Sequence, residues 1–209
     1  MGLRVSIHIK QRTDKRNEME FVIFIMLYPN KRNIHRPPHI YQDNTFYFIT
    51  ARTIKKNRFF NTIKKKEILF RILGDVLKKY GWQLYTWVIL DNHYHLISKI
   101  KEGEDLKFFI KDFHSLSAKD LNRLENKQGR KIWYQYWDYR IRNEKDFYLH
   151  FNYIHHNPVK HDYVKIQDEV LNYPFCSYKQ WVDKKGGEWM SDCFRRYPII
   201  DFTVGGDDF

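Results

Sequence analysis

The spacing of hydrophobic positions changes several times from residue 39 onward. Runs rich in β-branched and aromatic residues indicate β-strands, whereas apolar residues three or four positions apart indicate amphipathic helices. The first pattern predicts strands at 45–52, 82–90, 93–100 and 132–141. The second pattern predicts helices at 61–80, 105–126 and 144–157, the last of them ended by Pro158.

The order of these elements is strand, helix, strand, strand, helix, strand, followed by one more helix. Asp91 and Asn92 separate the second and third strands and are good turn residues, so these strands are predicted to form a hairpin. The order is that of a ferredoxin-like antiparallel sheet (βαββαβ), and we predict an α+β fold with an added helix. Because unrelated functions occur on such sheets, function has to be inferred from individual residues.

The 209 residues are enough for one folded domain with short extensions. Pro37 and Pro38 lie in a polar stretch that is typical of a linker, so we expect the domain to span 39–182. Residues 1–38 are expected to be an N-terminal arm, or upstream sequence included in the reading frame. Residues 183–209 are expected to be a C-terminal tail.

The chain is strongly basic, with a formal net charge of +12 at neutral pH. Such a charge attracts polyanions and favours binding to a phosphate backbone through counterion release. Ten Lys or Arg residues fall within residues 51–80, against only Glu67 and Asp75. Nucleic acid is therefore the first partner to consider, although the same charges are compatible with a merely solvated helix face.

The cysteines and the apolar runs bear on the cellular compartment. Cys176 and Cys193 are the only cysteines, which gives no disulfide framework and favours a reducing compartment, so we expect a cytoplasmic protein. The longest apolar run near the N-terminus, residues 21–27, is too short to span a bilayer and is flanked by charged residues. No membrane segment is predicted.

The segment WVILDNHYHLI, residues 87–97, contains two histidines one residue apart. Residues two apart on a strand point to the same face, so His93 and His95 can present two imidazole nitrogens to one cation. An isolated pair of this kind is more often two ordinary half-exposed strand residues. A metal site therefore needs further ligands from elsewhere in the chain.

The third predicted helix offers such residues in the segment YIHHNP. Tyr153 and Asn157 are four residues apart, which places them on one helix face. An Asn oxygen is a hard ligand suited to Mg²⁺ or Mn²⁺, and a tyrosine beside such a cation can attack a phosphodiester. Zinc is less favoured because no cysteine lies near the histidines in sequence. Tyr148 and Asn152 have the same spacing on a different face, so spacing alone does not select the tyrosine.

Together, the two segments resemble the motifs of the HUH single-tyrosine transposases, in particular the REP-associated tyrosine transposases. WVILDNHYHLI is similar to the family's His-hydrophobic-His motif, and YIHHNPVK is similar to its catalytic-helix motif. The fragments YFITART, IWYQYWDYRIRNEKDF and YPFCSYKQW also match, so the resemblance covers roughly residues 39–182. One departure is Asp91, which stands where the family usually has a proline and puts the rigidity of the turn in doubt.

The resemblance implies a role for each motif residue. His93 and His95 would bind a divalent cation, either Mg²⁺ or Mn²⁺. Asn157 would complete the protein ligands, and Tyr153, selected over Tyr148 by the family register, would be the nucleophile. In this family the tyrosine cleaves single-stranded DNA, keeps a 5′-phosphotyrosine link and frees a 3′-hydroxyl. The base that accepts the tyrosine proton stays unassigned; the nearby candidates are His155, His156 and His161.

Basic and aromatic residues near the motifs are candidates for DNA contacts. Cations interleaved with aromatic rings can bind phosphates while stacking unpaired bases. The candidates of this kind are Arg52, Lys55, Lys56, Arg58 and Phe59, followed by Phe60. Arg140 and Arg142 precede the third helix, where they could contact phosphates or instead pair with Asp138 or Glu144. Asn122 on the second helix is a candidate for gripping a DNA hairpin.

Four tryptophans on the predicted strands are expected in the hydrophobic core. Their positions follow the strand period, and large aromatic side chains more often fill cores than stack on bases. The four are Trp82, Trp87, Trp133 and Trp137.

The sequence thus predicts a metal-dependent tyrosine DNA strand transferase that acts on single-stranded DNA with a hairpin end, as a monomer or homodimer. An alternative is a catalytically idle descendant that only binds hairpin nucleic acid, marked by salt-sensitive binding without cleavage. Replication-initiator or relaxase activity uses the same chemistry but is expected to come with an appended helicase or large second domain, for which the sequence gives no sign.

Overall fold

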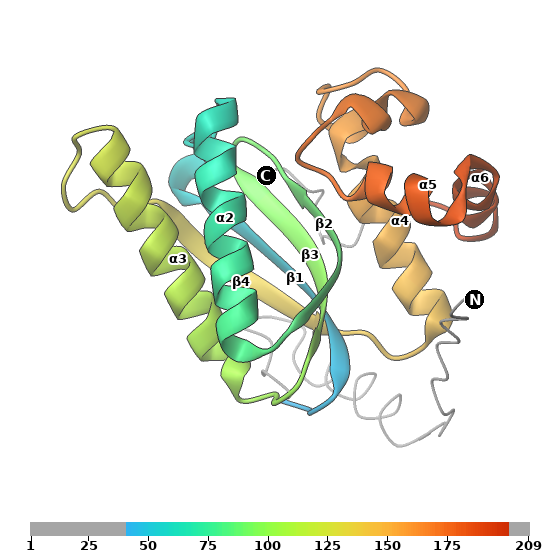
Figure 1. Ribbon diagram of the computed structural model, residues 1–209, viewed down its shortest axis with the longest axis horizontal. Helices are drawn as coiled ribbons and strands as arrows, with labels where there is room; N and C mark the ends of the chain where they lie inside the picture. The colour runs from blue at the N-terminus through green and yellow to red at the C-terminus, as the bar shows by residue number, and fades with distance from the viewer. Residues whose placement is uncertain (1–40, 201–209) are drawn as a thin grey trace, which may run out of the picture. The chain divides into compact units, whose positions relative to one another are not determined.

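The computed structural model describes residues 41–200 (Figure 1). The strands are β1 (Thr45–Thr53), β2 (Gln83–Ile89), β3 (His93–Ile100) and β4 (Trp133–Arg140). The helices are η1 (Ile54–Lys56), α2 (Ile63–Tyr80), α3 (Asp105–Leu124), α4 (Glu144–Lys160), η2 (Gln167–Asn172), α5 (Tyr178–Lys185) and α6 (Gly187–Arg196). None of these helices is long and apolar enough to cross a membrane. The predicted arm at 1–38 and residues 201–209 of the predicted tail lie outside the described residues.

The four strands form one antiparallel sheet in the order β2-β3-β1-β4. β1 and β3 lie at the centre, β2 and β3 form the predicted hairpin, and β4 is an edge strand beside β1. In a split βαβ unit, the strand that follows the helix leaves room for another strand between itself and the first, and β3 fills that place here. The predicted α+β class with a ferredoxin-like antiparallel sheet is confirmed.

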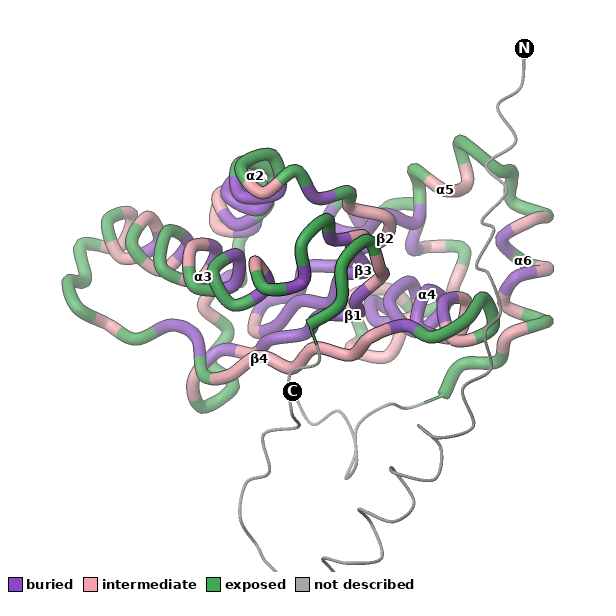
Figure 2. Tube along the Cα trace, turned by 90° about the horizontal axis from the view of Figure 1, so that it is seen from below, coloured by how far each residue is buried: buried purple, intermediate pink, exposed green. Residues whose placement is uncertain are grey.

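Helices α2 and α3 cover one face of the sheet, and α4 lies against the other face (Figures 1 and 2). On the first face, Phe70 of α2 stacks on Trp87 with 4.3 Å between the ring centroids. On the second face, Phe48 of β1 contacts His150 of α4, with 4.7 Å between the ring centroids. The sheet therefore has no solvated face at its centre, and polar side chains on its second face are enclosed by α4.

The strand register decides which residues point toward α4. Arg52 lies opposite His93 and Thr50 lies opposite His95, and directly opposed residues of antiparallel strands share a face. Tyr94, between the two histidines, points the other way, where its ring contacts α3. The two histidines are therefore presented together to the helix that carries the predicted nucleophile.

The prediction that Pro158 ends the third helix is wrong, because α4 continues through it to Lys160. Proline lacks the backbone N–H that would bond to the carbonyl of Ile154, but so close to the helix end the loss is limited to that bond. The N–H of His161 still donates to the carbonyl of Asn157, at 3.0 Å. The last turn of α4 thus stays helical.

The segment predicted as a C-terminal tail contains α6, which packs against α4. The Nδ2 atom of Asn152 donates to the carbonyls of Cys193 and Tyr197, at 2.9 and 2.7 Å. Tyr148 stacks on the ring of Tyr197, with 4.9 Å between centroids. The tyrosine–asparagine pair that competed with Tyr153 and Asn157 therefore attaches α6 to the helix, on a face away from the histidines.

Candidate active site

The two histidines lie side by side at the start of β3. His93 and His95 are each 1% exposed, and their ring centroids are 5.0 Å apart. They are therefore not the half-exposed strand residues of the alternative interpretation. Burying two imidazoles is unfavourable unless their nitrogens find polar partners or a cation, so their surroundings decide their role.

Helix α4 brings the two predicted helix residues to the histidines. The Oδ1 atom of Asn157 lies 3.3 Å from the Nε2 atom of His93, although 64 positions separate them in sequence. The ring of Tyr153 lies edge-on to that of His95, with 5.2 Å between centroids, and Tyr153 is 2% exposed. The Nδ2 atom of Asn157 donates to the carbonyl of Tyr153 at 2.9 Å, which fixes the amide on the shared helix face. The structure thus gathers all four residues predicted from the two motifs.

Burial keeps both imidazoles neutral. Burial, followed by the charge of nearby His161, lowers the pKa of His93 to about 3. Burial and the neighbouring His93 lower the pKa of His95 well below its ordinary value. Because desolvation disfavours the charged form of a base, each ring keeps one nitrogen lone pair at neutral pH, as a metal ligand requires.

Two imidazoles and one amide oxygen form a donor set that fits Mg²⁺ or Mn²⁺. Adjacent ligands of an octahedral ion with bonds of about 2.1 Å lie about 3.0 Å apart, close to the 3.3 Å between His93 and Asn157. Among residues 41–200, no group of three or more His, Cys, Asp or Glu side chains is placed to hold a metal. The candidate ligands are therefore all neutral, and a DNA phosphate would be the natural source of balancing charge.

Two further side chains at the end of α4 border the site. The Nζ atom of Lys160 lies 5.3 Å from the centroid of the Tyr153 ring. Lys160 follows Tyr153 by seven residues, two helical turns, so the same spacing argument that paired Tyr153 with Asn157 could have found it. The ring of His161 lies 4.7 Å from that of His93. An ammonium group here would favour negative charge that develops on the phenol oxygen or on a phosphate.

Of the three histidines considered as a base, His161 is the one beside the site. The Nε2 atom of His155 lies 2.9 Å from the Thr86 hydroxyl and 2.8 Å from the Ser177 hydroxyl, in a buried cluster between α4, β2 and the start of α5. His156 bonds to a side chain of η2. His155 and His156 therefore hold neighbouring elements in place.

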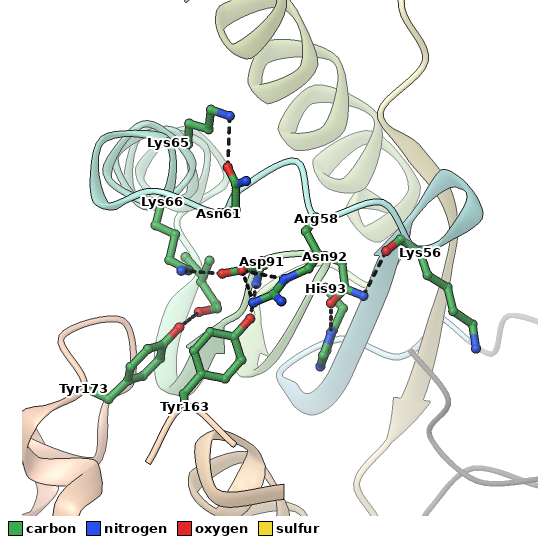
Figure 3. Close-up of polar contacts among 11 residues, drawn as sticks. Lys56, Arg58, Asn61, Lys65, Lys66, Asp91, Asn92, His93, Tyr163 and Tyr173 are labelled. Carbon is green, nitrogen blue, oxygen red and sulfur yellow. Dashed lines mark hydrogen bonds and ion pairs between the residues drawn. The ribbon is translucent and has the colours of Figure 1, made fainter. Parts of the chain in front are cut away.

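Asp91, the departure from the family pattern, is held by several bonds (Figure 3). Its carboxylate accepts hydrogen bonds from Lys66 at 2.6 Å and Arg58 at 2.8 Å, and its N–H donates to the hydroxyl of Tyr163 at 3.0 Å. Burial by itself raises the pKa of Asp91, but the bonds and charges of Lys66 and Arg58 outweigh it and lower the pKa. Ionised Asp91 thus fixes the turn without a proline.

Four predicted DNA contacts lie beside the histidine pair. Arg52 is the cross-strand neighbour of His93, and its guanidinium lies 4.8 Å from the centroid of the Tyr134 ring. Lys55 and Lys56 follow in η1 and are exposed. Arg58 also stays accessible, because 68% of its side chain is exposed despite its bond to Asp91. Cations therefore line the rim of the site on the η1 side.

The predicted aromatic DNA contacts separate into two kinds. Phe60 is fully buried and stacks on Trp133 with 5.3 Å between centroids, so its interpretation as a base-stacking residue is wrong. The N–H of Phe60 donates to the carbonyl of Asp91 at 2.8 Å, and this bond to the fixed turn holds Phe60 in the core. Phe59 is only half-buried, with the Arg130 guanidinium 4.7 Å from its ring centroid.

The remaining predicted contacts are less close to the histidines. Both polar atoms of the Asn122 amide bond to Arg130. Nδ2 donates to the Arg130 carbonyl at 2.8 Å, and Oδ1 accepts from the Arg130 Nε at 3.0 Å. This geometry favours a role in holding the loop after α3 over the predicted hairpin contact. Arg140 donates to the side chain of Gln42, and the guanidinium of Arg142 lies 5.6 Å from the centroid of the Tyr139 ring.

One residue assigned to the core is partly exposed, on the same face of the sheet as His95. Trp82, Trp87 and Trp133 are buried as predicted. Trp137 is half-buried, because β4 is an edge strand whose residues from Gln135 to Arg140 all stay partly exposed (Figure 2). Trp137 lies opposite Thr50, which lies opposite His95, so all three share the α4 face. Strand periodicity could not distinguish a central strand from an edge strand and so could not find this residue.

Comparison with known proteins places the chain in a family. Residues 41–157, more than half of the chain, match the family described as "Transposase IS200 like". The chain therefore belongs to the IS200-like transposases, as its motifs predicted. Membership of this family makes it a DNA transposase, a protein that binds and recombines DNA.

Two known proteins show how far the similarity extends. The REP-associated tyrosine transposase of Escherichia coli K12 is 28% identical over 167 residues, which cover 77% of this chain and 90% of that protein. The solved structure of a REP-associated tyrosine transposase bound to a REP hairpin has a TM-score of 0.60 and 24% identity, and the match covers 72% of this chain and 87% of that one. The second likeness concerns the fold.

Proposed function

We propose that this chain is a metal-dependent single-stranded DNA endonuclease and strand transferase with Tyr153 as its nucleophile. The observation that carries the proposal is the position of Tyr153 beside a buried, neutral donor set. That set consists of His93, His95 and Asn157. A phenol next to ligands for a hard cation is suited to attack on a phosphodiester.

In the proposed step, the phenol oxygen of Tyr153 attacks the phosphorus of a DNA phosphodiester. The bond from phosphorus to the 3′-oxygen breaks, so the downstream strand becomes a 5′-phosphotyrosine and the upstream strand leaves with a 3′-hydroxyl. The phenol loses its proton and the leaving oxygen gains one, so protons balance. A Mg²⁺ or Mn²⁺ ion held by the three ligands would polarise the phosphate oxygens. Attack of a different 3′-hydroxyl on the phosphotyrosine would join two strands without an external energy source.

Other side chains of the site support this chemistry. The hydrogen bond from the Asn157 amide to the Tyr153 carbonyl keeps ligand and nucleophile in one orientation. Lys160 adds positive charge near the phenol ring. The burial of Tyr153 limits the access of water that could hydrolyse the intermediate.

We propose single-stranded DNA with a hairpin as the substrate. The similar solved structure holds a REP hairpin, and the net charge of +12 suits a phosphate backbone. Arg52, Lys55, Lys56 and Arg58 would contact phosphates beside the site, and Trp137 would stack on an unpaired base. Phe59, Arg140 and Arg142 would extend this surface.

A second candidate, an idle protein that only binds hairpin nucleic acid, is favoured by one observation. Tyr153 is 2% exposed, so the phosphate must reach a phenol that is covered before substrate arrives. In that case binding would be salt-sensitive and no covalent intermediate would form under any metal.

The test is to incubate the purified protein with single-stranded hairpin DNA, labelled at the 3′ end or the 5′ end, with Mg²⁺, Mn²⁺ or EDTA. The proposal expects the 3′ label to migrate with the protein on a denaturing gel, the 5′ label to be released, and neither event in EDTA. Binding without any adduct would support the idle binder. An adduct that carries the 5′ label would contradict the proposed polarity.

A further inference from the structure

The turn between β2 and β3 directly precedes His93, the first of the candidate metal ligands, and is bonded to residues of other elements (Figure 3). It includes Asp91 and Asn92, directly before His93. The carbonyl of Asn92 accepts the N–H of Thr53 at 2.8 Å, and the Asp91 carboxylate bonds to Lys66 and Arg58. The backbone of the turn is therefore fixed from two sides, and the Asn92 side chain starts from a defined position.

The amide of Asn92 has only one orientation that satisfies both of its contacts. One end lies 3.2 Å from the carbonyl of Lys56, which can only accept a hydrogen bond, so that end is Nδ2. The other end, Oδ1, lies 2.7 Å from the Nδ1 atom of His93. Because an amide oxygen can only accept, Nδ1 of His93 carries the proton of the neutral ring.

The contact with Asn157 taken alone would favour a proton on Nε2 instead, so the two contacts of the His93 ring compete and their distances have to be compared. The Asn157 amide is oriented by its donation to the carbonyl of Tyr153, so its oxygen faces the Nε2 atom of His93 at 3.3 Å. With the proton on Nδ1, the lone pair of His93 Nε2 faces a lone pair of the Asn157 oxygen at this longer distance. The opposite tautomer would place two lone pairs at the shorter distance of 2.7 Å, against Asn92. The proton therefore lies on Nδ1, in the shorter contact with Asn92. The lone pairs of His93 Nε2 and Asn157 Oδ1 then both point to the place where a cation would bind.

The partner of Asn92 lies in a strained segment. Lys55 and Lys56 both have left-handed backbone conformations, with φ of 53° and 57°. Such conformations are unfavourable for residues other than glycine and persist only where surrounding contacts hold them. The bond from Asn92 to the Lys56 carbonyl is one such contact. Asn92 therefore links the basic residues of η1 to the His93 ring.

We propose that Asn92 is a positioning residue: it holds the proton of His93 on Nδ1 and turns the Nε2 lone pair toward Asn157 and the cation. This inference rests on the proposed metal site. Outer partners of this kind typically change metal affinity by about 10- to 100-fold when they are removed. Asn92→Leu should therefore weaken Mn²⁺ binding by about that factor.

The test combines two readouts on the full chain. Nitrogen-15 NMR of the metal-free wild type reports which imidazole nitrogen of His93 is protonated, and titration calorimetry measures Mn²⁺ affinity. Asn92→Asp keeps an oxygen acceptor for His93 and should restore most of the affinity lost in Asn92→Leu. Asn61→Leu is the matched control, because Asn61 lies in the neighbouring loop, is exposed and bonds to Lys65 instead of a histidine.

The inference expects the Nδ1-protonated tautomer in the wild type, a mixture of tautomers in Asn92→Leu and unchanged binding in Asn61→Leu. A wild-type ring protonated on Nε2 would overturn it, as would equal Mn²⁺ affinity in Asn92→Leu and wild type. If the wild type shows the Nδ1 tautomer but binds no Mn²⁺ even with DNA present, the proposed metal site fails instead. Circular dichroism of each variant confirms that the fold is intact.

Discussion

The imidazole ring of His95 and the phenol ring of Tyr153 lie edge to face, with 5.2 Å between their centroids. His95 comes from the central hairpin of the sheet, and Tyr153 comes from the helix that covers it. Together with the contact between His93 and Asn157, this contact joins the two sequence motifs into a single site. A cation bound by the histidines would therefore lie close enough to Tyr153 for both to act on the same phosphate.

Replacing one histidine tests the metal site. We expect His95→Ala to lower Mn²⁺ affinity by more than about 100-fold, because loss of a direct ligand should exceed the effect of losing an outer partner. Electron paramagnetic resonance of free Mn²⁺, with hairpin DNA present, gives the affinity. His156→Ala is the control, since that ring lies on the same helix but bonds to η2. Equal affinities in the two variants would argue against a metal bound by the histidine pair.

Trp137 provides a test of the single-strand contact. We expect Trp137→Ala to weaken binding of single-stranded DNA by about 1–3 kcal/mol, the usual effect of losing one base-stacking aromatic ring. Fluorescence anisotropy at fixed salt measures this change. Phe108→Ala, at a 48% exposed aromatic residue on α3, should leave affinity unchanged. If both variants bind like the wild type, bases do not stack on the β4 edge.

The neighbouring residues Phe59 and Phe60 should differ in what they affect. Phe60 is fully buried against Trp133, so Phe60→Ala should lower the free energy of unfolding by about 3–5 kcal/mol. Phe59→Ala should cost at most about 1.5 kcal/mol, because its ring is only half-buried. Urea denaturation measures both values. Similar losses for the two variants would contradict the assignment of Phe60 alone to the core.

Asp91 should be important for stability. Asp91→Asn leaves the ammonium of Lys66, a residue only 6% exposed, without its charge partner, and we expect a loss of about 3–5 kcal/mol. Asp75→Asn breaks an exposed ion pair with Arg71 and should cost no more than about 1 kcal/mol. Thermal unfolding of both variants makes the comparison. If Asp91→Asn is as stable as Asp75→Asn, another contact must fix the turn.

Local rules were sufficient for most of the fold and for the main residues of the site. Strand alternation placed His93 and His95 on one face, and helical spacing placed Tyr153 and Asn157 on another. Both patterns depend only on backbone geometry, which the sequence expresses directly. That the two faces would meet came from the family resemblance.

The sequence was less informative where long-range packing decides the outcome. Phe60 looked like a member of a basic aromatic run, but the turn at Asp91 draws it into the core. Trp137 looked like a core residue, but β4 lies at the sheet edge. Pro158 was expected to end α4, but it lies so near the helix end that only one bond is lost. The outcomes at Phe60 and Trp137 depend on partners that are distant in sequence, whereas the outcome at Pro158 depends on its position near the helix end.

The most direct test of the account is to identify the residue that carries the DNA in the covalent adduct. The adduct formed with hairpin DNA and Mn²⁺ is digested with nuclease and protease, and the modified peptide is sequenced by mass spectrometry. We predict a nucleotide on Tyr153, an adduct abolished by Tyr153→Phe, and an adduct retained in Tyr148→Phe. A nucleotide on any other residue, or an undiminished adduct in Tyr153→Phe, would contradict the central claim.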